Sequence, residues 1–232
     1  MSGRWVARLL NVAIIGLLGL SVMFASPQAS AGSCPDIEVV FARGSGEPPG
    51  IGGVGQAFVD EVRARAGGKS VGVYAVKYAA STDFSDRPGI ARTVAAGIGD
   101  ERAHLESMAA SCPKTRLVLG GFSQGAALTG MATSSVFPSG LAPALTPPPL
   151  PPDVAEHVAA VVFFGKPSGE LLPRYSVRSI SVSPLYRAKT LDLCAPGDAV
   201  CEGILNGPRA AHRLYPVNGM VGRGATYAVG LL

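Results

Sequence analysis

The sequence predicts an α/β protein with a doubly wound parallel sheet whose two faces are covered by helices. Two observations support this prediction. Five short apolar runs recur along the chain, and stretches with a helical pattern separate most of them, an alternation typical of parallel sheets. In addition, the apolar run that begins near Arg116 meets a sharp Gly-Phe-Ser-Gln-Gly turn, and a small-residue helical pattern follows it.

Each expected element has a simple basis in the sequence. The strands are runs rich in valine and other apolar residues, bounded by turn-forming residues, at residues 37–42, 70–77, 115–120, 158–164 and 188–193. The helices are the patterned stretches between them, at residues 54–66, 90–110 and 124–135, with a last helix after Gly219. Functional groups of such sheets gather at the C-terminal strand ends. The loops 78–89 and 165–187 should therefore share one rim.

The turn at residues 121–125 carries the strongest functional signal. A serine between a strand and a helix, with glycines two residues before and two after it, exposes its hydroxyl at the sheet edge. The glycines are needed because the strand and the helix pass close to each other. The positive end of the helix dipole then points at charge that develops beside Ser123. We therefore predict a nucleophilic serine in a fold of the α/β-hydrolase type; the alternative is a glycine-rich turn that happens to contain a serine.

A serine nucleophile requires a base, and the chain contains three histidines. His104 lies in a charged helical segment and is expected on an exposed helix face. His157 precedes an apolar run and is expected as a polar residue at a strand start. His212 lies in a loop context downstream of Ser123, which agrees with the order serine, acid, histidine in this fold type. His212 is therefore the predicted base.

The acid that orients the histidine is expected just after the strand at 188–193. Asp198 stands there in a Pro-Gly turn between Cys194 and Cys201, although turn propensity alone also favours an aspartate at such a place. Asp192 is the rival acid. It is an interior strand residue and is less able to reach a histidine beyond the sheet edge.

Four segments, taken in order, resemble the cutinase family, and in particular the secreted cutinase-like esterases of mycobacteria. They are residues 39–45 with Glu47 after them, the turn at residues 120–125, the Cys194 to Cys201 loop around Asp198, and Ala211-His212 with Tyr215 three residues after the histidine. The resemblance extends from about Cys34 to the C-terminus. It implies an exposed active-site serine and a fold without a lid.

The resemblance also implies a role for each site residue. Ser123 would be the nucleophile, His212 the general base and Asp198 the residue that orients it, while Ser45 and Gln124 would form the oxyanion hole. The chemistry of acyl transfer agrees, because the backbone N–H after the nucleophile is the expected first oxyanion donor. Ser45 follows the first strand, so its N–H and hydroxyl can point over the same sheet edge.

The four cysteines all lie in the part of the chain expected to be exported, where disulfides are favoured. Cys34 and Cys112 each precede an expected strand, and parallel strands begin at the same edge of a sheet, so these two cysteines can pair. Cys194 and Cys201 then remain, and the family pattern has the same pairing. No metal site is expected, because no Cys-x-x-Cys pair or nearby histidine accompanies the cysteines. No cofactor is expected either.

Residues 1–31 are predicted to be a cleaved secretory signal peptide, and residues 32–232 a cutinase-like α/β-hydrolase domain. Two arginines precede an apolar stretch at residues 9–25, and Ala29-Ser30-Ala31 provides a small-residue cleavage site. An uncleaved anchor is the alternative, because the stretch is close to the ~17 residues that can span a bilayer. We expect a secreted protein, either extracellular or associated with the cell wall.

The charge of the chain limits its partners. The formal net charge is +4, and loss of Arg4 and Arg8 with the signal peptide leaves +2. So small an excess argues against nucleic acid and against an acidic membrane surface. The expected partner is a small-molecule or lipid ester bound by a monomer, with loose association with the cell envelope left open.

Two further features concern access to the site. Lys166 and Arg213 replace residue types more usual in the family. They are either solvated surface charges or part of a rim that accepts anionic or polar head groups beside the ester. The proline-rich connector at residues 145–152 is expected to be extended. Because the helix after Ser123 returns to the opposite sheet edge, the connector is not expected to cover the serine.

The sequence thus predicts a secreted serine carboxylesterase of the cutinase type, which hydrolyses short- to medium-chain carboxylic esters of lipids or polyesters through an acyl-enzyme. Phospholipase, thioesterase or acyltransferase activity would use the same acyl-enzyme and is the first alternative. A non-catalytic secreted lipid-binding or adhesion protein is the second. The presence of a complete set of site residues argues against it.

Overall fold

The computed structural model describes residues 34–136, 148–175, 177 and 179–232. The expected signal peptide and residues 145–147 of the connector lie outside these ranges. The fold described below is that of the unit formed by residues 33–232. In the described part of the chain, no helix combines the length and the apolar character needed to cross a bilayer.

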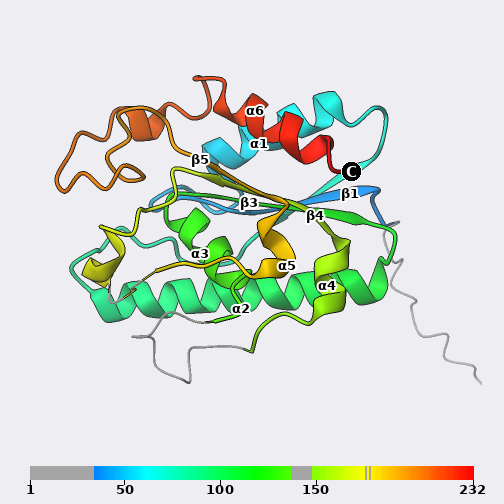
Figure 1. The fold of residues 1–232 in the computed structure, drawn as a ribbon, viewed down its shortest axis with the longest axis horizontal. Coiled ribbons are helices and arrows are strands. Elements are labelled where there is room, and N and C mark those ends of the chain that lie inside the picture. The colour runs from blue at the N-terminus through cyan, green and yellow to red at the C-terminus, as the bar shows by residue number, and fades with distance from the viewer. Residues whose placement is uncertain (1–33, 137–147, 176, 178) are drawn as a thin grey trace, which may run out of the picture. The chain divides into compact units, whose positions relative to one another are not determined.

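Five parallel strands form the central sheet, in the order β2-β1-β3-β4-β5 (Figure 1). The strands are β1 (Ile37–Ala42), β2 (Val71–Ala75), β3 (Arg116–Phe122), β4 (Val158–Phe164) and β5 (Thr190–Leu193). β1 and β4 are buried along their whole length, which explains why they read as continuous apolar runs. The predicted five-stranded parallel sheet is confirmed. The strand order reverses between β1 and β3, and ligands of such sheets bind beyond the C-terminal strand ends at this point.

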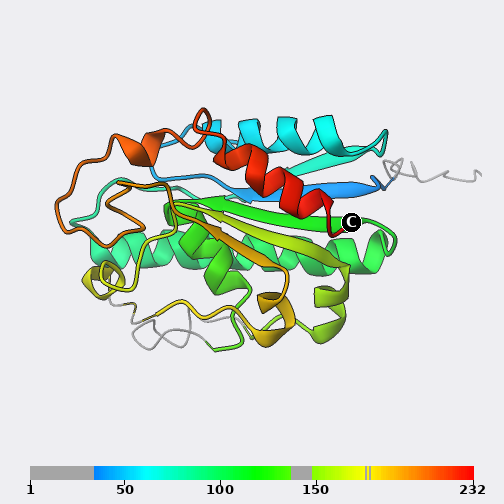
Figure 2. The ribbon, with the colours of Figure 1, turned by 45° about the horizontal axis from the view of Figure 1, so that its top comes forward.

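Helices cover both faces of the sheet (Figures 1 and 2). The longer helices are α1 (Gly52–Arg65), α2 (Arg87–Ser111), α3 (Gln124–Ala132) and α6 (Met220–Val229). The shorter ones are α4 (Pro152–His157), α5 (Pro184–Arg187) and the 3-10 helices η2 (Leu172–Tyr175) and η3 (Ala211–Arg213). α1 and α6 pack on one face, and α2, α3, α4 and α5 lie on the other.

The two cores follow from the alternation of side chains along the buried strands. In β1, Val39 and Phe41 face α1 and α6, whereas Val40 and Ala42 face α2 and α3. Phe41 packs against Phe58 of α1, with 6.1 Å between ring centroids. The helices are therefore held on the sheet by apolar burial on both sides.

The short helices were not predicted, because four to six residues are too few for a helical period to be visible. α4 begins at Pro152 and α5 at Pro184, and proline suits the first helical turn, where no N–H donor is required. His157 consequently ends α4 and does not start a strand. α3 ends at Ala132, three residues earlier than predicted.

The prediction of an exposed helix face for His104 was wrong. Its Nε2 lies 2.7 Å from Glu38 Oε2, and its ring stacks on Tyr74 with 3.5 Å between centroids. Glu38 lies on β1 and is 8% exposed. A carboxylate so enclosed requires a polar partner, and His104 supplies it from α2.

The Cys34–Cys112 disulfide ties the start of the sheet to α2. Its Cα atoms are 5.6 Å apart. Cys34 precedes β1, and Cys112 lies between α2 and β3. The bridge therefore joins two segments at the sheet edge opposite to Ser123.

Candidate active site

Ser123 lies on a strained turn between β3 and α3. Its φ of 54° and ψ of −118° are unusual for a residue with a side chain, and such backbone strain is found mainly at functional sites. A Cβ atom at Gly125 would lie 2.0 Å from the carbonyl oxygen of Ala42. A Cβ atom at Gly121 would lie 2.5 Å from the carbonyl oxygen of Gly125. Both flanking glycines are therefore required by close backbone contacts.

His212 contacts the hydroxyl of Ser123. The short helix η3 carries the histidine, and its Nε2 is 2.9 Å from Ser123 Oγ. The imidazole is largely enclosed, with Phe122 packed against it at 4.8 Å between ring centroids. Neither His104 nor His157 makes this contact.

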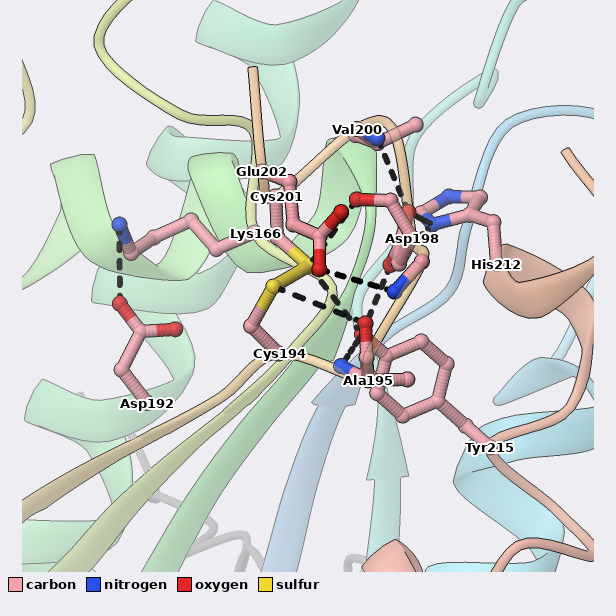
Figure 3. The surroundings of a disulfide bond; sticks show 11 residues. Lys166, Asp192, Cys194, Ala195, Asp198, Val200, Cys201, Glu202, His212 and Tyr215 are labelled. Atoms are coloured by element: carbon pink, nitrogen blue, oxygen red, sulfur yellow. Dashed lines mark hydrogen bonds and ion pairs between the residues drawn. A yellow bond between two sulfur atoms is a disulfide. The ribbon is translucent and has the colours of Figure 1, made fainter. Parts of the chain in front are cut away.

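Asp198 holds the other side of the imidazole (Figure 3). Its carboxylate oxygens are 2.9 and 2.8 Å from His212 Nδ1. Oδ1 also accepts a hydrogen bond from the Val200 N–H at 2.9 Å, and Oδ2 accepts one from the Tyr215 hydroxyl at 2.7 Å. Burial alone would raise the pKa of Asp198, but the hydrogen bonds from His212 and Tyr215 outweigh it and lower this pKa. Asp198 is therefore a buried carboxylate that stays ionised.

The rival acid, Asp192, points to another partner. Its carboxylate is 3.0 Å from Lys166 Nζ, and Figure 3 shows this ion pair on the far side of the disulfide from His212. Cys194 and Cys201 are joined around Asp198, with their Cα atoms 5.7 Å apart. The structure thus brings Asp198, and not Asp192, to His212.

Ser45 and Gln124 lie on the same pocket as Ser123. Ser45 Oγ is buried and has no hydrogen-bond partner among the described residues. Gln124 is the first residue of α3, so its backbone N–H has no intrahelical acceptor. Both donors are available to a negative oxygen formed beside Ser123.

Glu47 and Arg43 hold the loop that carries Ser45. Glu47 accepts hydrogen bonds from the N–H groups of Gly44 at 2.6 Å and Gly53 at 2.7 Å. Arg43 donates to the carbonyl oxygens of Glu47 at 2.9 Å and Tyr78 at 2.8 Å. Sequence reasoning assigned no role to these two side chains, although both lie in the first of the four segments that resemble the family.

The pocket beside Ser123 is largely apolar. Phe84 and Tyr175, from the loops 78–89 and 165–187, both line it, and their ring centroids are 5.7 Å apart. The other apolar lining residues are Ile90, Ala91, Val94, Ala127, Met131, Pro167, Leu171, Leu172, Val177, Ala199, Val200 and Ile204. The two predicted rim loops thus meet at this pocket.

The fold and the hydrogen-bonded serine, histidine and aspartate define a protein of the α/β-hydrolase type. The family model described as Cutinase matches residues 33–231. The chain therefore belongs to the cutinase family of carboxylic ester hydrolases, which confirms the resemblance noted from its motifs.

Individual relatives agree with this assignment. The chain is 53% identical over 170 residues to a probable carboxylesterase, Culp7, of Mycobacterium tuberculosis, covering 72% of this chain and 88% of the relative. It is 41% identical over 233 residues to the phospholipase Culp4 of the same organism, covering 97% and 94%. Among solved structures, the Trichoderma reesei cutinase in complex with a phosphonate inhibitor is 27% identical, with a TM-score of 0.62 over 85% of this chain and 77% of that chain.

Proposed function

We propose that the protein hydrolyses carboxylic esters through a covalent acyl-enzyme on Ser123. The observation that carries the proposal is the unbroken line of contacts from Ser123 Oγ through His212 to the buried Asp198. An acid that stays ionised can hold the imidazole in the tautomer whose Nε2 accepts a proton.

The reaction follows from this arrangement. Ser123 Oγ attacks the ester carbonyl carbon as His212 Nε2 accepts the hydroxyl proton. The resulting oxyanion accepts hydrogen bonds from Ser45 and from the Gln124 N–H, and the loss of one such donor typically costs about 2.7–4 kcal/mol. The alcohol leaves with the proton from His212. A water molecule, deprotonated by the same histidine, then releases the acid and restores Ser123.

The apolar pocket favours the proposal that the substrates are esters with short to medium acyl chains. Most of its lining residues are apolar, and apolar side chains from the two loops and α2 lie beside Ser123. A lipid or a polyester would supply such an acyl group. Phospholipase action is a second candidate, favoured by the relative of that name; thioesterase and acyl-transfer reactions would use the same intermediate.

We further propose that the protein is secreted and acts as a monomer. The two disulfides support an oxidising compartment, and the expected signal peptide at residues 1–31 provides the route. The mass of the N-terminal peptide from protein in the culture medium checks this: a start at residue 32 is expected, and a retained residue 1 would contradict cleavage.

The replacement Ser123→Ala tests the acyl-enzyme. Hydrolysis of p-nitrophenyl butyrate should fall by roughly 10⁴-fold or more, because a triad acts as a unit. The far-UV circular dichroism and the melting temperature should stay near those of the wild type. Ser107→Ala on the exposed face of α2 is the matched control and should keep full activity. If Ser123→Ala keeps more than a few per cent of the rate, Ser123 is not the nucleophile.

A further inference from the structure

The lining of the pocket beside Ser123 includes two arginines and no acidic residue. Arg174 belongs to η2, and Arg209 belongs to the loop that precedes η3. Both segments lie at the same end of the sheet, at the left of Figure 2. Both residues are exposed, and neither guanidinium has a hydrogen-bond or ion-pair partner among the residues that the structure describes.

Two other cations at this end of the sheet are engaged elsewhere. Lys166 forms its ion pair with Asp192, and Arg43 donates to two backbone carbonyls. Arg213, which directly follows the histidine, does not line the pocket. The two cations that the sequence singled out are thus not the ones that face the pocket.

The acids nearest in sequence to the two arginines have partners of their own. Glu202 accepts a hydrogen bond from the Gly197 N–H at 2.8 Å. The nearby Ser168 hydroxyl lowers the pKa of the exposed Glu170. Neither carboxylate is part of the pocket lining. The lining of the pocket therefore carries two cationic side chains and no carboxylate beside its apolar wall.

We propose that the pocket selects esters that carry an anionic group, a phosphate or a carboxylate, on the alcohol side of the scissile bond. The apolar wall holds the acyl chain, which leaves the exposed Arg174 and Arg209 for the polar part of the ester. A guanidinium donates two parallel hydrogen bonds to either anion. This inference rests on the proposed function of Ser123.

The test compares two esters that differ only in charge. The substrates are 1-octanoylglycerol 3-phosphate and neutral 1-octanoylglycerol, both dissolved as monomers below their aggregation limits. The proteins are the wild type, Arg174→Gln, Arg209→Gln and the double variant. Arg187→Gln is the matched control, because Arg187 is equally exposed but lies on α5, before β5 and so at the opposite sheet edge.

The wild type should prefer the anionic ester in kcat/KM. Each pocket variant should lose ~2- to 5-fold on that ester alone, the range for exposed charge pairs, and the double variant should lose more. Added salt should reduce the preference of the wild type, because it screens exposed charges. Arg187→Gln should keep the preference.

Two results would overturn the anion subsite. The first is an equal anionic-to-neutral ratio in the wild type and the double variant. For the second, hydrolysis of phosphatidylglycerol vesicles is measured as well. If the arginine variants lose activity on the vesicles and keep full activity on the monomeric anionic ester, the arginines contact a lipid surface. Failure of the wild type to hydrolyse either monomeric ester would instead overturn the proposed function.

Discussion

The hydroxyl of Tyr215 donates a hydrogen bond to Asp198 Oδ2 at 2.7 Å and accepts one from the backbone N–H of Ala195 at 3.0 Å. Tyr215 is fully buried. It therefore joins the carboxylate beside His212 to the backbone at the end of β5. In the sequence, Tyr215 is only one residue of the family resemblance, whereas its contacts in the structure make it a positioning residue for Asp198.

Replacement of this tyrosine should separate catalysis from binding. In Tyr215→Phe, the Asp198 carboxylate loses a donor, and a hydrogen bond to a charged group contributes about 1.5–3 kcal/mol. We expect kcat to fall by roughly tenfold or more at an unchanged KM, with a lower melting temperature because the Ala195 N–H loses its acceptor. Steady-state kinetics and thermal unfolding measure both. Tyr227→Phe on α6 is the control, and a wild-type kcat in Tyr215→Phe would show that the contact has no part in the reaction.

The two disulfides should differ in what they support. Loop-closure entropy assigns about 2.5 kcal/mol to the Cys194–Cys201 bridge and about 4.5 kcal/mol to Cys34–Cys112, since the sequence separations are 7 and 78. The shorter bridge, however, encloses Asp198, and a displacement of ~1 Å can reduce a rate about a hundredfold.

Of the two double variants, Cys194→Ser/Cys201→Ser should therefore show the larger fall in kcat. Cys34→Ser/Cys112→Ser should show the larger fall in the free energy of unfolding. Denaturant unfolding and kcat, measured on both double variants, check the contrast. Unchanged turnover in the first variant would show that the shorter bridge is irrelevant to catalysis.

The buried Glu101 should make stability depend on pH. Burial raises its pKa from 4.5 to about 8, although Thr129 and Arg102 oppose the shift. Between these values the folded protein binds a proton that the unfolded chain has lost. The stabilisation is complete below about pH 4.5 and decreases toward pH 8, by about 1.4 kcal/mol per pH unit.

Glu101→Gln keeps the shape of the neutral acid and cannot ionise. Its free energy of unfolding should therefore fall less than that of the wild type between pH 5 and pH 8. Urea unfolding of both proteins across this range gives the difference. Parallel pH profiles of the two proteins would mean that Glu101 is ionised throughout.

The connector should not control access to Ser123. α3 begins beside the serine and ends at Ala132, and the chain then returns to β4 through Leu150, which is buried in the core, and Pro148, whose carbonyl accepts from Arg102. Replacement of residues 140–146, the segment that leads into the connector and includes its first two residues, by a short Gly/Ser turn shortens this connection and keeps both contacts. Turnover should stay within a few-fold of the wild type.

The rate on tributyrin should likewise rise smoothly through its solubility limit, as expected for a site without a lid. A sharp increase when droplets form, lost on shortening the connector, would contradict both the topological argument and the expectation of a lidless site.

Much of the fold followed from local patterns. Buried parallel strands are continuous apolar runs, and β1, β3 and β4 were predicted nearly to the residue. The turn around Ser123 was also readable, because only glycine fits where Gly121 and Gly125 meet neighbouring backbone. The short helices α4 and α5 were missed, since their stability comes from proline and packing and not from a repeating pattern.

The sequence by itself determined the order of the elements, the family and the residues proposed for chemistry, since each depends on residue type and spacing. Only the tertiary structure decided which side chains meet. It paired Asp192 with Lys166, placed His104 against Glu38, and set the Tyr215 hydroxyl on Asp198. Such contacts join segments far apart in the chain, and their geometry depends on how the helices and loops pack on the sheet. A pattern within one segment carries no information about that packing.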